Sequence, residues 1–387
     1  MFTRLTDATR ESCGGKAAAL GDLLRAGLPV PDGFVIPHDI DQTSGHVVPP
    51  SLRVEVAGEL ARLGNPVVAV RSSALNEDTA DASAAGQYES VIGVQGVTDV
   101  CKAITTCWTS ADAPRVSDYW DRSRDDTSPP ASSMAVLVQQ VIAADVSGVM
   151  FTPQHSGEPT RIEASWGLGL SVVGGTVTPD TYEVAADLSV SHRVGSKQTR
   201  VDLDTVRGGV ATTVPPRQQQ ARTLDDDTVL ALAALGKQIA AIQGGPQDVE
   251  WAVAEGTIWI LQARPITAAL PTAPHPTAPT SPEALRGTPG SHGTVTGTAR
   301  TIRGPSDFSL VKPGDILICP YTDPAWTPLF RVAAGVITET GGALSHAAIV
   351  AREYGIPAVL GVPDALNLIA SGQQLTLDGT AGTITPA

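Results

Sequence analysis

One segment decides how this 387-residue chain is interpreted: Thr340-Gly341-Gly342-Ala343-Leu344-Ser345-His346-Ala347-Ala348-Ile349-Val350-Ala351-Arg352-Glu353. Paired glycines precede Ser345 and His346, and a run with helical character follows them. Gly355 and Pro357 end that run, because glycine favours a left-handed helix cap and proline cannot continue a helix. The segment therefore predicts a glycine turn followed by a short helix with His346 in its first turn.

A histidine in this position has a chemical use. The free backbone N–H groups and the dipole of the first helical turn favour an anion. A neutral imidazole there can attack a phosphorus centre, and the same donors would then hold the phosphohistidine. The alternative is a histidine that only caps or packs, and for an isolated Ser-His pair it would be preferred.

The complete string resembles the phosphohistidine (swivelling) domain of the phosphoenolpyruvate-utilising dikinase family, which includes pyruvate phosphate dikinase, phosphoenolpyruvate synthase and rifampicin phosphotransferase. The resemblance implies that His346 carries a phosphoryl group during the reaction. It also implies a β/α fold for the surrounding domain.

The composition limits the classes of protein and partner. With 42% apolar and 17% charged residues, the chain is ordinary for a globular protein, and its length predicts two or three domains. The net charge of −14 argues against nucleic acid or an anionic membrane as a main partner. An acidic chain that binds ATP must gather its cations locally, so individual Lys and Arg positions are informative.

Several observations predict a soluble cytoplasmic protein. The four cysteines have no spacing typical of a metal site, which fits buried thiols in a reducing compartment. No window approaches 18 uninterrupted apolar residues, and the first residues lack a signal-peptide pattern.

A proline-rich segment predicts the domain boundary. Residues 268–286 cannot form a helix or a central strand, because prolines recur at Pro271, Pro274, Pro276, Pro279 and Pro282. In an extended conformation, Pro271 to Pro282 would span roughly 35 Å. We predict a linker over 268–286 between domains at 1–267 and 287–387, as a passive spacer or a mobile connection.

Both flanking regions show mixed α/β (α+β) patterns. After the linker, strands are predicted at 293–302, 315–320, 335–339 and 358–362, with a hairpin over 374–385. Before it, the patterns predict helices at 16–26 and 229–242, strands at 67–70 and 135–141, and a hairpin over 251–261 that turns at Glu255-Gly256.

Two clusters near the N-terminus offer cations to phosphates. Gly14-Gly15-Lys16 opens onto a helix and can present backbone donors and one ammonium, although it lacks the Walker A spacing. Arg71 ends a strand before a Ser- and Gly-rich stretch that continues to Gln87, so its planar fork could reach phosphate oxygens. An exposed lysine and a strand-end salt bridge are the alternatives.

Two later clusters complete the pattern. Gly167 and Gly169, after Glu163, would allow close backbone approach to a ligand, although structural turn glycines explain them equally well. The predicted hairpin carries Asp248 and Glu250 on one strand and Gln262 and Arg264 on the other. Glu250 and Gln262 can converge as oxygen ligands for Mg²⁺, with Arg264 on the same strand face as Gln262.

In this order the clusters resemble the ATP-grasp nucleotide-binding domain of the same dikinase family. The resemblance implies that three cations contact the phosphates of ATP and act in catalysis with His346: Lys16, Arg71 and Arg264. It further implies Mg²⁺ ligation by Glu250 and Gln262, with Asp248 beside them. Residues of the adenine-contacting hinge are implied at Gln139, Gln140 and Val141.

The resemblance implies a dikinase reaction. ATP would yield AMP, phosphate and a phosphohistidine at His346, which passes its phosphoryl group to an acceptor at a separate station. The chain ends directly after the histidine domain, so we expect neither the C-terminal pyruvate-binding barrel nor the inserted helical acceptor domain of relatives. We therefore do not expect phosphoenolpyruvate synthesis by this chain alone.

Three functions fit these observations. The first is a compact dikinase whose acceptor is a small molecule, such as a specialised metabolite or antibiotic. The second is one subunit of a split dikinase whose acceptor domain is a separate protein. The third, a non-catalytic nucleotide-binding regulator, is ranked last because the site residues are intact. Asp323 could serve as an acceptor-side base, although a turn-forming role before Pro324 is preferred.

Overall fold

The computed structural model describes residues 2–40, 47–75, 88–111, 134–204, 208–271 and 284–387. Two predicted features fall largely outside these ranges: the Ser- and Gly-rich continuation after Arg71, and residues 272–283 of the proline-rich linker. In the described ranges no helix has both the length and the apolar character needed to cross a bilayer.

The N-terminal sheet is antiparallel, with strand order β1-β2-β5-β3-β4. Its strands are β1 (Thr3–Arg4), β2 (Gly33–Ile36), β3 (Val68–Ser73), β4 (Ser90–Val94) and β5 (Ala135–Gln140). Its helices are η1 (Leu5–Asp7), α1 (Arg10–Arg25), α2 (Pro50–Arg62) and α3 (Val97–Ser110).

Strand alternation places these helices on opposite faces of the sheet. On β5, Val136 and Val138 belong to the hydrophobic cluster of α2 and α3, whereas Ala135 and Leu137 belong to the cluster of α1. Successive side chains of a strand point to opposite faces of the sheet. Because helices cover both faces of β5, both sets of its side chains can be apolar.

The second sheet is also antiparallel, with strand order β13-β12-β6-β7-β8-β9. Its strands are β6 (Val146–Phe151), β7 (Thr160–Trp166), β8 (Asp180–Val184), β9 (Val190–Arg193), β12 (Gln247–Ala254) and β13 (Thr257–Pro265). Beside it lie α5 (Leu170–Val173), α6 (Pro216–Gln219), α7 (Asp226–Gln243) and the separate hairpin of β10 (Thr199–Asp204) and β11 (Gly208–Thr213).

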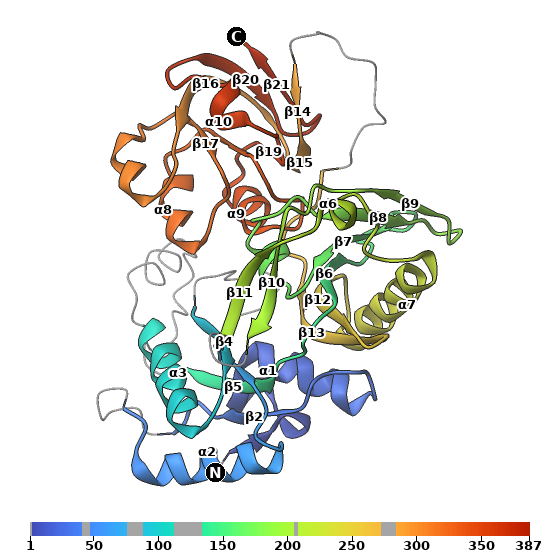
Figure 1. Ribbon diagram of the computed structural model, residues 1–387, viewed down its shortest axis with the longest axis vertical. Helices are drawn as coiled ribbons and strands as arrows, with labels where there is room; N and C mark the ends of the chain where they lie inside the picture. The colour runs from blue at the N-terminus through green and yellow to red at the C-terminus, as the bar shows by residue number, and fades with distance from the viewer. Residues whose placement is uncertain (1, 41–46, 76–87, 112–133, 205–207, 272–283) are drawn as a thin grey trace.

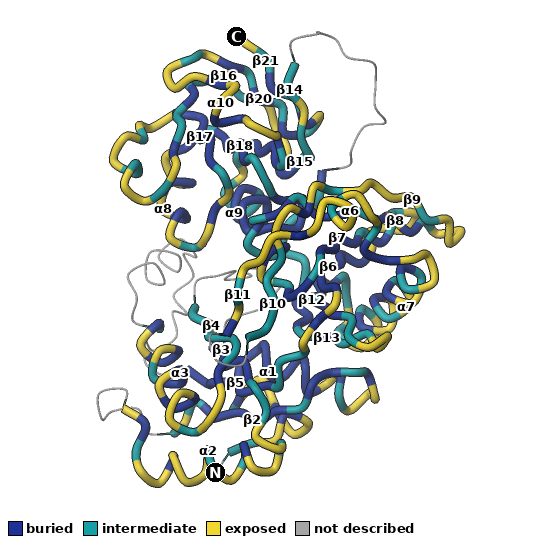
Figure 2. Tube along the Cα trace, in the orientation of Figure 1, coloured by how far each residue is buried: buried dark blue, intermediate teal, exposed yellow. Residues whose placement is uncertain are grey.

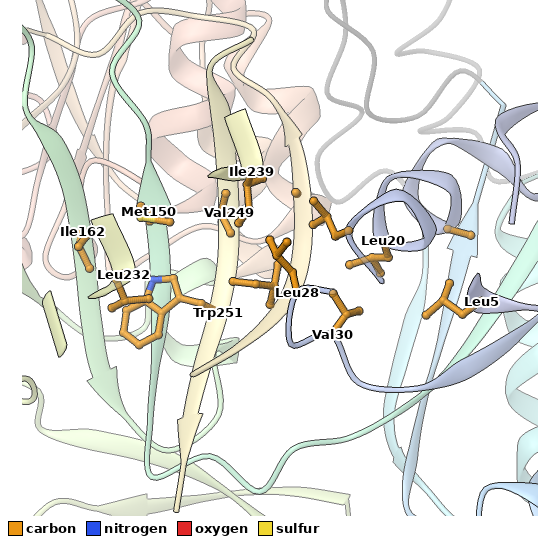
Figure 3. Packing of buried hydrophobic residues seen from close by; sticks show 14 of the residues in the cluster. Leu5, Leu20, Leu28, Val30, Met150, Ile162, Leu232, Ile239, Val249 and Trp251 are labelled. Atoms are coloured by element: carbon orange, nitrogen blue, oxygen red, sulfur yellow. The ribbon is translucent and has the colours of Figure 1, made fainter. Parts of the chain in front are cut away.

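One hydrophobic core joins the two sheets. Leu232 and Ile239 of α7 pack with Trp251 of β12, and Leu20 of α1 belongs to the same cluster (Figure 3). The predicted hairpin is confirmed, and both residues of its turn have positive φ angles, 50° at Glu255 and 75° at Gly256. That combination is typical of a tight two-residue hairpin.

The C-terminal part contains a mixed sheet with strand order β14-β21-β20-β16-β17-β18-β19-β15. Its strands are β14 (Leu285–Arg286), β15 (Thr288–Ser291), β16 (Thr294–Thr301), β17 (Ile316–Cys319), β18 (Gly335–Thr338), β19 (Ala358–Leu360), β20 (Gln374–Asp378) and β21 (Thr383–Pro386). Its helices are η2 (Pro305–Leu310), η3 (Pro324–Trp326), α8 (Thr327–Phe330), α9 (His346–Tyr354) and α10 (Ala365–Leu368).

The central strands of this sheet, β16 to β19, run parallel and are covered on both faces. Leu317 of β17 packs with the cluster of α8 and α9, whereas Ile316 and Ile318 pack with α10 and the β20–β21 hairpin. The mixed α/β (α+β) class predicted from the sequence is confirmed by the three layered regions.

The C-terminal part rests on the second sheet (Figure 1). Thr340 Oγ1 donates to the Gly175 carbonyl at 2.6 Å, and the Gly341 amide donates to the Val177 carbonyl at 3.0 Å. Leu344 packs in a cluster with Val149 and Phe151 of β6. As Figure 2 shows, α9 lies among buried residues where the two parts meet.

Both ends of the predicted linker are held by structure. The Pro271 carbonyl accepts a hydrogen bond from Arg161 Nη1 of β7 at 3.0 Å. Leu285 and Arg286 pair with β21, so the C-terminal sheet begins two residues before the predicted domain start at 287. The domain limits themselves stay a prediction.

A buried ion pair organises the second sheet beside this contact. Asp180 of β8 accepts hydrogen bonds from the amides of Gly195 and Thr223, both at 2.8 Å, and pairs with Lys197. The side chains of Asp180 and Lys197 are 1% and 0% exposed. Removing one partner of a buried pair leaves an uncompensated charge, which is strongly destabilising.

We predict that Lys197→Met lowers the free energy of unfolding by about 3–5 kcal/mol, because Asp180 loses its counter-charge. Urea denaturation followed by circular dichroism measures this loss. Lys237→Met, at an exposed position of α7, is the matched control and should change stability by less than about 0.5 kcal/mol. Equal stabilities of the two variants would contradict the assignment.

Candidate functional site

His346 begins α9, as predicted. Ser345 occupies the N-cap, and the helix ends at Gly355 in the left-handed conformation (φ 65°). Gly341 has a φ of 103°, a conformation that other residues rarely adopt, so the turn before the helix depends on glycine there.

The imidazole of His346 is buried, at 6% exposure. Nδ1 lies 3.0 Å from Thr322 Oγ1, whereas Nε2 has no hydrogen-bond partner among the described residues. When Nδ1 carries the proton and donates it to Thr322, Nε2 presents its lone pair. Burial, together with the nearby Arg264 charge, lowers the pKa of His346 to about 4, so the ring is neutral at neutral pH.

Thr322 was not identified from the sequence, although a signal existed. It follows β17, and the loop to His346 follows β18, a parallel neighbour of β17. Carboxyl ends of adjacent parallel strands lie at the same sheet edge, where ligand-binding residues gather. Asp323, the next residue, accepts from the Ala325 amide at 2.8 Å, which is the preferred turn-forming role.

Lys16 lies next to the second predicted cluster, which contains Arg71. It is buried, at 5% exposure, and its Nζ donates to the Ser72 carbonyl at 2.9 Å, next to Arg71. Gly14 (φ 78°) makes this contact possible, because a Cβ there would lie 2.1 Å from the Ser73 carbonyl oxygen. Lys16 is therefore not the exposed helix-start lysine of the alternative interpretation.

Arg71 connects the two antiparallel sheets. Its Nη1 donates to the Leu261 carbonyl of β13 at 2.9 Å. Its Nη2 lies 3.5 Å from Glu250 Oε2 and also donates to Gln262 Oε1. The structure thus brings Arg71, from a distant part of the sequence, to Glu250 and Gln262, which were predicted to converge on the hairpin.

A β-bulge in the hairpin produces this convergence. Trp251 pairs with Ile260, but beyond the register shift Glu250 pairs with Gln262 and Asp248 pairs with Arg264. The bulge leaves Leu261 unpaired, and its carbonyl is the group that accepts from Arg71. Such bulges re-aim side chains next to functional sites.

Asp248 and Arg264 form a buried ion pair. Asp248 Oδ2 accepts from Arg264 Nε at 2.9 Å and from Nη2 at 2.8 Å, whereas Oδ1 has no partner among the described residues. Burial raises the pKa of Asp248, although the charge of Arg264 opposes that shift. Asp248 and Arg264 line a small cavity with Ile349 and Arg352 of α9, the helix that His346 begins, so the hairpin end faces this helix.

The donor set of the hairpin fits Mg²⁺. Glu250, Gln262 and Asp248 all offer oxygen, and the buried Oδ1 of Asp248 has a vacant lone pair. Mg²⁺ prefers oxygen ligands and usually binds through one or two carboxylates plus substrate phosphates. The described ranges contain no cluster of three or more His, Cys, Asp or Glu side chains arranged for a metal.

The predicted adenine hinge lies at the end of β5. The side-chain amides of Gln139 and Gln140 donate to the carbonyls of Pro31 (3.1 Å) and Leu63 (3.3 Å). Val141 belongs to an apolar cluster, between the sheets and the β10–β11 hairpin, whose members include Ile142, Leu168, Val201, Leu203 and Leu261. The hinge role stays a prediction, and the cluster adds apolar residues that the sequence did not identify.

Glu163 of β7 had no assigned role in the sequence. Its Oε1 accepts from the Ala343 amide at 2.6 Å and its Oε2 from the Leu344 amide at 3.2 Å. Burial raises the pKa of Glu163 to about 7, although those two amides oppose the shift. A Cβ on Gly342 would lie 2.3 Å from Oε2, so the second glycine of the pair makes room for this carboxylate.

Two family models match this chain. Residues 41–284 match the family described as pyruvate phosphate dikinase, AMP/ATP-binding domain. Residues 311–382 match the family described as PEP-utilising enzyme, mobile domain. These matches confirm the predicted ATP-grasp and swivelling-domain fold classes.

Curated relatives agree with the family models. A probable phosphoenolpyruvate synthase of Methanothermobacter thermautotrophicus is 35% identical, over 96% of this chain and 61% of its own length. One from Archaeoglobus fulgidus is also 35% identical, over 96% of this chain and 56% of its own. The phosphoenolpyruvate synthase of Pyrococcus furiosus is 36% identical, over 82% and 40%.

This chain thus spans about half the length of the curated relatives it matches. The ATP-binding match alone covers more than half of the chain, and the mobile-domain match contains His346. The chain therefore belongs to the pyruvate phosphate dikinase and phosphoenolpyruvate synthase family.

Proposed function

We propose that this chain is an ATP-dependent, dikinase-type phosphotransferase that transfers a phosphoryl group from ATP to His346 and then to an acceptor. The observation that carries the proposal is the buried Nε2 of a neutral His346, which has no hydrogen-bond partner among the described residues. A nucleophile in this state needs no base to remove a proton from the attacking nitrogen. The helix that His346 begins faces Arg264 of the hairpin across a small cavity.

The nucleotide site is proposed between the two antiparallel sheets. The apolar cluster around Val141 and Leu261 suits an adenine ring, because ligand pockets combine apolar walls with few polar groups. Lys16, Arg71 and Arg264 would contact the phosphates. Mg²⁺, held by oxygens of Glu250, Gln262 and Asp248, would offset the negative charge of the phosphates during transfer.

The covalent step follows from the geometry of His346. The Nε2 lone pair forms a bond to phosphorus, while the bond from phosphorus to the leaving oxygen breaks and that oxygen keeps the electron pair. Nδ1–H remains donated to Thr322, which stabilises the positive charge on the ring. Over the complete half-reaction, ATP and water give AMP, phosphate and one phosphoryl group on His346.

In the second half-reaction an oxygen of the acceptor attacks this phosphorus. The N–P bond breaks, its electron pair returns to Nε2, and the acceptor oxygen loses its proton to solvent or a base. Splitting the transfer in this way replaces one difficult step by two easier ones.

The acceptor is proposed to be a small molecule, such as a specialised metabolite or antibiotic, or to be bound by a separate acceptor-domain protein. The names of the matched relatives add phosphoenolpyruvate formation as a third possibility to test. A mass-spectrometric acceptor screen with Mg-ATP distinguishes these cases. AMP formation stimulated by a small molecule alone supports the first case, and a requirement for a second protein supports the second.

A cytoplasmic location belongs to the same proposal. All four cysteines lie in described ranges, are buried and form no disulfide, which is the usual state in a reducing compartment. The net charge of −14 disfavours nucleic acid and anionic membranes as partners.

We predict that Mg-ATP labels the purified protein on His346 and releases AMP. The phosphoprotein should be labile to acid and stable to base, because it contains an N–P bond, and His346→Ala should abolish both the label and AMP formation. Radiolabelled ATP with product chromatography measures both quantities. His292→Ala, an exposed histidine of the same part, is the control; labelling of His346→Ala at the normal rate would overturn the proposal.

We predict that Thr322→Val slows phosphorylation of His346 by about 10-fold, because the hydrogen bond that fixes Nδ1 is lost. Thr322→Ser keeps the hydroxyl and should restore most of the rate. The tautomer of His346 can be read independently from nitrogen chemical shifts in NMR spectra. A valine variant with both normal rate and normal tautomer would show that Thr322 has no positioning role.

We predict that His346 titrates near pH 4 in the ligand-free protein. Because its pKa is depressed below the ordinary value of 6.5, the unfolded state binds more protons between these values, and stability falls as pH decreases through them. The neutral fraction of His346 should therefore stay constant from pH 8 to pH 6. An NMR titration of the ring proton checks this, and a midpoint above pH 6 would contradict it.

A further inference from the structure

Arg352 lies in the last turn of α9, on the same helix as His346. Its Nη1 donates to two carbonyl groups, those of Ala343 and Gly290, each at 2.8 Å. Ala343 belongs to the loop that leads into His346, and Gly290 belongs to β15. Arg352 therefore holds this loop against its own sheet.

The guanidinium of Arg352 also reaches the second sheet. It lies over the Phe151 ring of β6, with the carbon of the guanidinium 5.9 Å from the ring centroid. A small cavity beside it is lined by Arg352 and Ile349 from α9 and by Asp248 and Arg264 from the hairpin. The guanidinium of Arg352 thus lies against groups of both parts of the molecule.

The carboxylates that balance this charge come from both parts: Asp248 and Glu163 belong to the second sheet, and Glu353 belongs to α9 itself. Burial lowers the pKa of Arg352 to about 10, and the negative charges of Asp248 and Glu163 oppose that shift. Asp248 uses Oδ2 for Arg264, and its Oδ1 has no hydrogen-bond partner among the described residues. Asp248, which is paired with Arg264, thus lines one cavity together with Arg352 from the other side of the boundary.

One residue, Ala343, is hydrogen-bonded to groups on both sides of this boundary. The Ala343 amide donates to Glu163 of the second sheet, and the Ala343 carbonyl accepts from Arg352. A shift of Arg352 consequently moves the loop that orients His346. A buried cation is costly without a counter-charge, so the position beside Asp248 favours the docked arrangement of the two parts.

We propose that Arg352 is a positioning residue that couples docking of the C-terminal part on the β12–β13 hairpin to the orientation of His346, with Asp248 as its counter-charge. The inference rests on the proposed phosphorylation of His346 by ATP. Asp248 then has a second task beside any contact with Mg²⁺, which is to recognise the helix that carries the nucleophile.

The test compares two phosphoryl donors in single-turnover reactions. Mg-ATP reaches His346 only in the docked arrangement, whereas phosphoramidate is a small donor that needs no nucleotide site. We expect Arg352→Met to slow labelling by Mg-ATP by about 30-fold, with labelling by phosphoramidate within about twofold of the unsubstituted protein. Arg352→Lys retains the charge, so its rate of labelling by Mg-ATP should lie between those of Arg352→Met and the unsubstituted protein. Arg303→Met, at an exposed position of the same part, is the control.

Hydrogen exchange gives a readout that does not depend on ATP. The amides of Ala343 and Leu344 are protected by Glu163 only while the two parts are docked. Without nucleotide, both Arg352→Met and Asp248→Asn should increase exchange in peptides covering 340–345, while peptides of β16 and β17 keep their protection and show that the sheet is folded.

The outcomes are distinct. Equal slowing with both donors would mean that Arg352 only supports its own domain, and normal labelling by Mg-ATP would mean that it has no role; either result overturns the inference. If the unsubstituted protein is labelled by phosphoramidate but never by Mg-ATP, the proposed function fails. The exchange measurement then still decides whether Arg352 and Asp248 hold the two parts together.

Discussion

Burial of one imidazole in its neutral form is the constraint on which the proposed chemistry depends. His346 has one ring nitrogen fixed by Thr322 and the other buried without a partner. Burial is the larger cause of the low pKa of His346, and the charge of Arg264, which is paired with Asp248, adds to it. The glycine turn shapes the loop before His346, and the contact between the two parts buries that loop.

Charged side chains of one part of the chain face groups of the other part at this boundary. Glu163 of the second sheet caps the loop before His346, and Arg352 of α9 approaches Asp248 of the hairpin. Each of these groups becomes costly to bury when its counterpart is absent. Such complementary charges fix the register of an interface more than they add affinity.

Local signals in the sequence predicted the elements well, because caps and turns are encoded by neighbouring residues. Gly355 ends α9 and Glu255-Gly256 turns the hairpin, both as predicted. Long-range features were not predictable in the same way. The convergence of Glu250 and Gln262 was predicted, but a regular register would place Leu261 opposite Glu250, and the bulge that brings Gln262 there has no signature in the local pattern. Glu163 and Thr322 find their partners only through tertiary packing, so their roles were missed.

The anchoring of Pro271 on β7 has a consequence for how strongly the two parts must attract each other. The Pro271 carbonyl is hydrogen-bonded to Arg161, and Leu285 pairs with β21, so these two anchors bound the covalent connection between the two parts. A covalent connection gives the histidine a higher effective concentration at the opposite surface than a separate subunit would have. Contacts too weak to hold two separate chains together are then sufficient to populate the docked arrangement. The covalent connection keeps the two parts close together, and the interface determines only their relative orientation.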